Sequence, residues 1–200
     1  MSLLLGTSFG APVKKLNNQF VTNKVLYLGL PIAPLNTMFV IEKTSNGVKG
    51  FEIKGQYSSF FKLWVILLSV IGAWFGFIVG FVGKEPLFII VGVIFLALFI
   101  GSFFMWKVSE TEKFIREQFY KTLGTALMPE WLLEETFDKF FLLLQDHYKQ
   151  QYSALDWGNV VKNLKVSDAK FPLAFCLTYM KNIRNGNKLS NKNLVEIWQH

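Results

Sequence analysis

Leu63–Gly83 (LWVILLSVIGAWFGFIVGFVG) and Pro86–Trp106 (PLFIIVGVIFLALFIGSFFMW) decide the fold of this chain, because both stretches are uncharged and strongly apolar. Each has 21 residues. A helix of that length rises about 31 Å, which matches the hydrocarbon thickness of a bilayer. Neither stretch carries the polar stripe that a helix of a soluble protein turns toward water. We therefore predict a membrane protein with two transmembrane helices.

The connection between the two stretches consists of Lys84 and Glu85 alone. So short a connection requires the two helices to run antiparallel. Pro86 suits the first turn of the second helix, because its missing N–H would have no helical partner there. The sequence therefore predicts a transmembrane helical hairpin over residues 61–106, with spans 63–83 and 86–106.

Positive charge is concentrated outside this hairpin. Residues 1–62 carry a net charge of +5 and residues 107–200 a net charge of +2, whereas the two-residue turn is neutral. Because positively charged flanks stay on the cytoplasmic side, we expect a multi-pass protein of the inner or plasma membrane with both termini cytoplasmic. Trp64 and Trp106, at the cytoplasmic ends of the spans, are the expected interfacial anchors.

Small residues recur at helical spacing within both spans. Gly72, Gly76 and Gly80 form a stripe along the first span, and Ala97 and Gly101 form a shorter one along the second. Small side chains let helices approach closely in lipid, so these five residues are the predicted helix-packing positions. The first stripe either closes the hairpin on itself, which we favour because the partner helix is tethered alongside, or joins protomers in a homo-oligomer.

The segments that flank the hairpin show two different patterns. Residues 1–18 are expected to be a loose N-terminus. Residues 19–60 read as three or four short strands, with a hairpin turn at Asn46-Gly47, that form a small antiparallel β module. Residues 107–200 show the helical spacing expected of an all-α cytoplasmic domain. The predicted fold class is thus an α+β membrane protein.

Local signals predict where helices begin in the cytoplasmic domain. Serine, aspartate and proline are the residue types that favour a helix start, and Ser109 is followed three residues later by Glu112, as in a capping box. Starts are expected at Ser109, Pro129, Asp156, Pro172 and Ser190. We expect roughly five helices, which is enough to bury one small core.

Catalytic, cofactor-binding and metal-binding motifs are not recognisable in the sequence. There is no Gly-rich phosphate loop of the G-x4-G-K-[ST] type. Cys176, the only cysteine, lies in an apolar run and is expected to be buried and structural. Asp146 cannot orient His147, since neighbours on a helix point about 100° apart. We therefore predict no catalytic residue, no cofactor and no metal ligand.

Three functions are compatible with these patterns. The leading hypothesis is a non-enzymatic, membrane-anchored interaction or scaffold subunit that contacts membrane lipids and binds a protein through its cytoplasmic domain. No nucleic-acid partner is expected, because the lysines are dispersed singly. One alternative is a homo-oligomeric pore or membrane-disrupting effector gated by the cytoplasmic domain. The other is a membrane-bound enzyme acting on lipid-linked substrates, with His147, Glu134, Glu135 or Asp138 lining a cleft.

Overall fold

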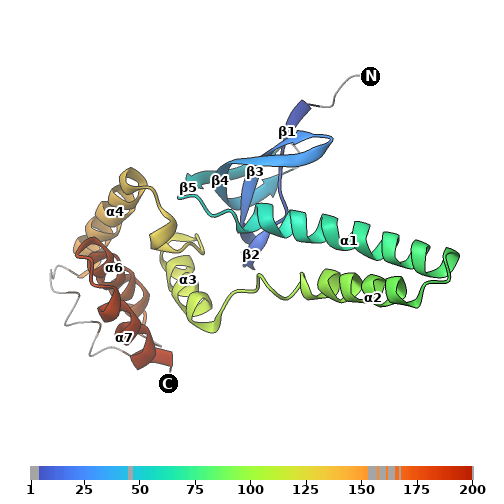
Figure 1. The fold of residues 1–200 in the computed structure, drawn as a ribbon. Coiled ribbons are helices and arrows are strands. Elements are labelled where there is room, and N and C mark those ends of the chain that lie inside the picture. The colour runs from blue at the N-terminus through green and yellow to red at the C-terminus, as the bar shows by residue number, and fades with distance from the viewer. Residues whose placement is uncertain are drawn as a thin grey trace. The chain divides into compact units, whose positions relative to one another are not determined.

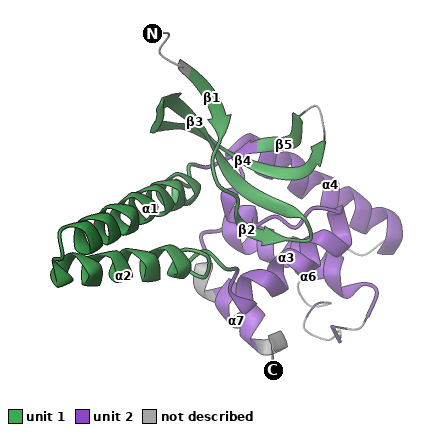
Figure 2. Ribbon diagram, turned by 90° about the vertical axis from the view of Figure 1, so that its right-hand side faces the viewer, with its two compact units in different colours: residues 1–51, 55–107 green, residues 52–54, 108–200 purple. Residues whose placement is uncertain are grey.

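The computed structural model describes residues 5–44, 47–152, 157, 161, 165–166 and 168–199. The chain is mixed α+β, with an antiparallel sheet followed by helices (Figure 1). It forms two compact units (Figure 2). The N-terminal unit comprises residues 1–51 and 55–107, and the C-terminal unit comprises residues 52–54 and 108–200. The expected β module and helical hairpin thus belong to one unit rather than two.

The sheet of the N-terminal unit is built around one long central strand. The strands are β1 (Leu5–Phe9), β2 (Val13–Leu16), β3 (Gln19–Leu28), β4 (Leu30–Thr44) and β5 (Gly47–Ile53). Their order is β1-β3-β4-β5, and β2 also pairs with β3. Val21, Val25, Phe39 and Val40 are fully buried and form the core of the sheet.

The first 18 residues differ from the loose terminus that the sequence suggested. β1 pairs antiparallel with residues 24–28 of β3, and β2 pairs with the beginning of the same strand. The long edge of β3 offers backbone donors and acceptors that these two short strands satisfy. Val13, which is buried, adds an apolar contact. The turn expected at Asn46-Gly47 falls partly outside the described residues.

Two apolar helices follow the sheet and run antiparallel (Figure 1). Helix α1 spans Ser58–Val82 and helix α2 spans Pro86–Gly101. Lys84 takes a left-handed backbone conformation, with φ of 55°, in the turn between them. Among the residues that the structure describes, α1 is the one helix long and apolar enough to cross a membrane.

Helix α2 ends earlier than the predicted span 86–106. At its end the Ser102 hydroxyl donates to the Phe99 carbonyl oxygen at 2.6 Å. The chain then continues as turns, in which the Phe104 N–H donates to the Gly101 carbonyl oxygen at 2.9 Å. A hydroxyl that bonds the preceding turn competes with regular helix geometry, and this bond lies at the point where α2 ends.

The C-terminal unit contains α3 (Glu110–Leu123), a 3-10 turn (Pro129–Trp131), α4 (Glu134–Tyr152), α6 (Phe171–Arg184) and α7 (Lys188–Gln199). The helix start at Ser109 is confirmed, because the Glu112 N–H donates to the Ser109 hydroxyl oxygen at 3.2 Å and caps the helix. Helix α4 begins at Glu134 rather than Pro129, since the proline opens the separate 3-10 turn. The helix start expected at Asp156 lies outside the described residues.

Helix α6 is the centre of the C-terminal core. Its residues from Leu173 to Leu177 are all buried. Phe171, Phe175 and Tyr179 stack along one side, with ring centroids 5.7 Å apart at each step. The prediction that Cys176 is buried is confirmed. Burial raises the pKa of its thiol far above the ordinary range, so the sulfur stays protonated and unreactive.

Candidate functional site

The glycine stripe of α1 lies directly against α2. A methyl group added at Gly72 would stand 2.5 Å from the ring of Phe95, and one at Gly80 would stand 2.5 Å from a side-chain carbon of Ile89. At Gly76 it would stand 2.6 Å from the backbone nitrogen of Gly92. These distances leave no room for any side chain. The stripe therefore packs within one chain and lets the two backbones meet.

The partner residues on α2 are not the two that the sequence suggested. Ala97 is exposed, and a methyl group at Gly101 would meet nothing within 4 Å. Gly92 takes their place, because a methyl group there would stand 3.1 Å from Phe77. Ala97 follows Phe95 by two residues, about 200° around the helix, and so points away.

Many large side chains of the hairpin are exposed. Only 17% of the most apolar 18-residue stretch of α1 is buried. The outward residues are large and apolar and cover both helices. On α1 they include Leu68, Val70, Ile71, Trp74, Phe75, Ile78 and Phe81, and on α2 Leu87, Ile90, Val93, Ile94, Leu96, Leu98 and Ile100. A pair of helices with glycine inside and bulky apolar residues outside has the surface that lipid requires.

Cations and tryptophans gather at the base of the hairpin, where α1 begins and α2 ends. Trp64 lies near the beginning of α1 and Trp106 lies beyond the end of α2, and both are half-buried. The Lys62 ammonium nitrogen lies 5.9 Å from the Trp106 ring centroid. The Lys107 nitrogen lies 4.6 Å from the ring of Phe104. Amphipathic aromatic rings beside lysines are typical of a membrane–water boundary.

A buried asparagine joins the sheet to α1. The Asn23 side-chain nitrogen donates to the Thr37 hydroxyl and to the Gln56 carbonyl oxygen, both at 2.8 Å. Its side-chain oxygen accepts the Phe60 N–H at 3.1 Å. The first N–H groups of a helix lack partners within the helix, and no local side chain caps α1. Asn23 therefore acts as the cap from a neighbouring strand.

A second set of contacts reinforces this junction. The Ser59 hydroxyl donates to the Ala11 carbonyl oxygen, and the Lys62 ammonium donates to the Pro12 carbonyl oxygen at 3.2 Å. The Gly10 N–H donates to the backbone oxygen of Asn23 at 2.8 Å. The segment between β1 and β2 is thus bonded to the first turns of α1. Sheet and helix are held together by these bonds as one body.

We expect Asn23→Ala to destabilise the N-terminal unit by about 2 kcal/mol, because it leaves the Phe60 N–H without its side-chain acceptor and leaves the Gln56 carbonyl oxygen with the 3.3 Å bond from the Thr37 hydroxyl alone. Thermal unfolding of the full chain in detergent measures this. Asn36→Ala is the matched control. It removes an asparagine of the neighbouring strand whose side-chain oxygen makes no hydrogen bond, and should cost less than about 1 kcal/mol. Equal losses in both variants would contradict the capping role.

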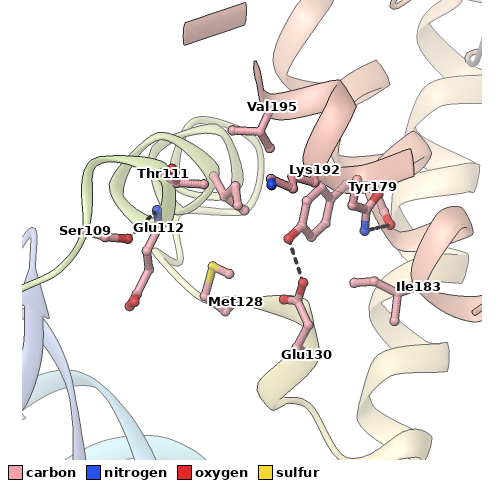
Figure 3. Close-up of a pocket in the computed structure, with 11 residues that line it drawn as sticks. Ser109, Thr111, Glu112, Met128, Glu130, Tyr179, Ile183, Lys192 and Val195 are labelled. Carbon is pink, nitrogen blue, oxygen red and sulfur yellow. Dashed lines mark hydrogen bonds between the residues drawn. The ribbon is translucent and has the colours of Figure 1, made fainter. Parts of the chain in front are cut away.

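The C-terminal unit contains a cavity of about 520 Å³ between α3, the 3-10 turn, α6 and α7 (Figure 3). The Tyr179 hydroxyl donates to a Glu130 carboxylate oxygen at 2.6 Å, and the Asn191 side-chain nitrogen donates to the Tyr179 carbonyl oxygen at 3.2 Å. Burial, together with the Glu130 carboxylate, raises the pKa of Tyr179 far above its ordinary value. The phenol is therefore a fixed donor and not an acid–base group.

The remaining walls of the cavity combine apolar and polar side chains. Ile115, Met128, Ile183 and Val195 are apolar, and Ser109, Thr111, Glu112 and Lys192 are polar. Neither a cysteine nor a histidine is among its lining residues. Such a cavity offers shape and apolar area to a bound group.

A fully buried arginine supports the wall of this cavity. The Arg116 Nε donates to the Ala126 carbonyl oxygen at 2.6 Å, and its Nη1 lies 3.3 Å from a Glu112 carboxylate oxygen. The guanidinium also lies 5.3 Å from the Trp131 ring centroid. Burial lowers the pKa of Arg116, and Glu112 opposes this shift. Sequence reasoning missed this cluster, because nothing in the local pattern distinguishes Arg116 from a surface cation.

The enzyme hypothesis needs His147, Glu134, Glu135 or Asp138 to line a cleft, and the structure distributes these four side chains over three places. Glu134 and Asp138 line a shallow depression with Lys54 and Arg184. Glu135 forms an exposed ion pair of 2.7 Å with Lys139. His147 lies at a separate depression and is 2.6 Å from the Gln151 amide nitrogen. In the described part of the chain, no group of three His, Cys, Asp or Glu is placed to hold a metal ion.

No family model, curated protein or solved structure matches this chain. Function must therefore be inferred from the geometry of the hairpin and of the two units.

Proposed function

We propose that this chain is a two-span integral membrane protein whose hairpin anchors a β module and a helical domain at the membrane, where the helical domain binds a protein partner. The observation that carries this proposal is the outward apolar surface of α1 and α2. A soluble protein would hide such a surface, because contiguous exposed apolar patches of this size are rare in water. In lipid, exposure of this apolar surface carries no free-energy penalty.

The length of the second helix is compatible with spanning. Helix α2 alone rises about 24 Å, whereas α1 rises about 37 Å. The apolar segment continues past α2 through Phe103, Phe104 and Met105, which are more than half exposed. Their N–H groups donate to carbonyl oxygens of Ile100 and Gly101. We propose that residues 86–106 together supply the second span, with the N–H groups of residues 103–105 satisfied by these bonds.

The homo-oligomeric pore is the second candidate, and one observation favours it. Ala97 and Gly101 are small residues one helical turn apart that point away from α1. In lipid, an outward small-residue stripe lets a second copy of the hairpin approach. The glycine stripe of α1 cannot serve this purpose, since α2 already covers it.

The protein partner of the anchored form is proposed to use the cavity of the C-terminal unit. The cavity combines apolar and polar side chains, and hydrogen bonds orient some of its polar groups. Pockets of this kind accept apolar side chains while a few placed polar groups define orientation. Affinity isolation of the intact protein from membranes would identify the partner.

The topology test uses two cysteine variants in a Cys176→Ala background. With both termini cytoplasmic, Lys84→Cys at the turn should react with a membrane-impermeant thiol reagent added outside intact cells, and Lys15→Cys in β2 should not. Both lysines are exposed, so accessibility within the protein does not differ. Labelling of both positions, of neither, or of Lys15→Cys alone would contradict the proposed topology.

A further inference from the structure

The end of the sheet where β3 meets β4 is apolar and exposed. Residues 25–41 contain no charged side chain. The large apolar side chains here are between 39% and 51% exposed. They form what we call the apolar tip: Leu28, Leu30, Ile32 and Leu35. Gly29, with φ of 74°, makes the turn at its end.

Two β-bulges turn part of this surface outward. Lys24 pairs with Asn36 and Val25 with Pro34, which leaves Leu35 as an extra residue in β4. Two pairs further on, Leu26 pairs with Ala33 and Tyr27 with Pro31, which leaves Ile32 as a second extra residue. A bulge redirects the side chain of the inserted residue. Both inserted residues are large, apolar and about half exposed, at 49% and 51%.

The tip lies on the side of the sheet toward which the hairpin extends. Asn23 fixes β3 to the beginning of α1 through the Phe60 N–H. From that point β3 continues to the tip, and Figures 1 and 2 both show the β3–β4 turn projecting in the direction in which α1 leaves the sheet. If the hairpin crosses a bilayer, the tip faces the surface of that bilayer.

We propose that the apolar tip inserts into the headgroup and upper acyl region of the bilayer that holds the hairpin, as a third and shallow membrane contact. This inference rests on the proposed two-span anchor. Lipid is the occupant favoured by the observations, because the tip belongs to the same compact unit as α1 and carries no charge that would have to be desolvated. Amphipathic segments at this boundary bury their apolar side about 5–10 Å deep.

The test places an environment-sensitive dye at single cysteines of the full chain in a Cys176→Ala background, reconstituted in phosphatidylcholine vesicles. Leu30→Cys reports the tip, and Lys43→Cys, an exposed position at the far end of β4, is the matched control. Phe81→Cys reports insertion of the hairpin independently. We expect a blue-shifted emission at Leu30→Cys that is quenched by lipids nitroxide-labelled near the headgroup, and neither effect at Lys43→Cys.

The outcomes separate this inference from the anchor itself. Quenching at Phe81→Cys without quenching at Leu30→Cys would overturn the tip insertion while leaving the anchor intact. Loss of quenching at both positions would overturn both. A blue shift at Leu30→Cys that lipid nitroxides do not quench would mean that protein covers the tip, which also overturns the inference. Leu30→Asp should in addition reduce quenching of a dye at Leu28→Cys.

Discussion

Arg116→Met is expected to destabilise the C-terminal unit by about 4 kcal/mol, because removing one member of a buried ion pair leaves the other group uncompensated. The variant removes the donor to the Ala126 carbonyl oxygen, the partner of Glu112 and the cation above Trp131 in one step. Methionine fills much of the volume, so the loss reports these polar contacts rather than a cavity.

The second arginine of the chain is the control for this measurement. Arg184 is 56% exposed and lies 3.7 Å from Asp138. Exposed ion pairs contribute little, so Arg184→Met should cost less than about 1 kcal/mol. Thermal unfolding of the full chain in detergent, followed by near-ultraviolet circular dichroism, compares the two variants. If Arg116→Met unfolds at the same temperature as the wild type, the buried cluster does not stabilise the domain.

Gly76→Leu is expected to force the hairpin apart at a cost of about 3 kcal/mol, because overpacking a closely packed interface strains the backbone. The first added carbon would stand 2.6 Å from the Gly92 nitrogen and 2.9 Å from the Phe88 carbonyl oxygen. Both neighbours are backbone atoms and cannot rotate away. Unfolding of the reconstituted protein by titration with a denaturing detergent measures the loss.

Gly101→Leu is the matched control on the second helix. Its added Cβ would meet nothing within 4 Å, so the stability of a single hairpin should not change. The same variant reports on the pore alternative, since a stripe used between protomers would lose its close approach. Equal destabilisation of the monomeric hairpin by both variants would show that the helices pack through another face.

The apolar character of the hairpin could be read from the sequence, but its rotational details could not. Absence of charge over 21 residues is a local property and indicates a lipid environment. That Gly92, rather than Ala97 and Gly101, faces the glycine stripe depends on the rotation of α2 about its own axis, which no spacing rule predicts.

The other differences between the predicted and the observed structure arise from contacts between residues that are far apart in the sequence. Strands β1 and β2 exist because β3 offers them an edge, not because residues 5–16 favour strands by themselves. Asn23 is unfavourable in a strand by propensity, and its buried position follows from the N–H groups of α1 that it satisfies. An asparagine within a β-prone run was the one signal that could have indicated this role.

A depth profile of the hairpin in a bilayer tests the membrane anchor most directly. Spin labels placed in turn at Lys62, Gly101 and Lys84, and at outward positions between them such as Trp74 and Val93, would be compared for accessibility to oxygen and to a water-soluble relaxant. A two-span hairpin predicts the greatest depth at Trp74 and Val93, with Lys84 back in water. Greatest depth at Lys84, or exposure to the water-soluble relaxant along both helices, would contradict it.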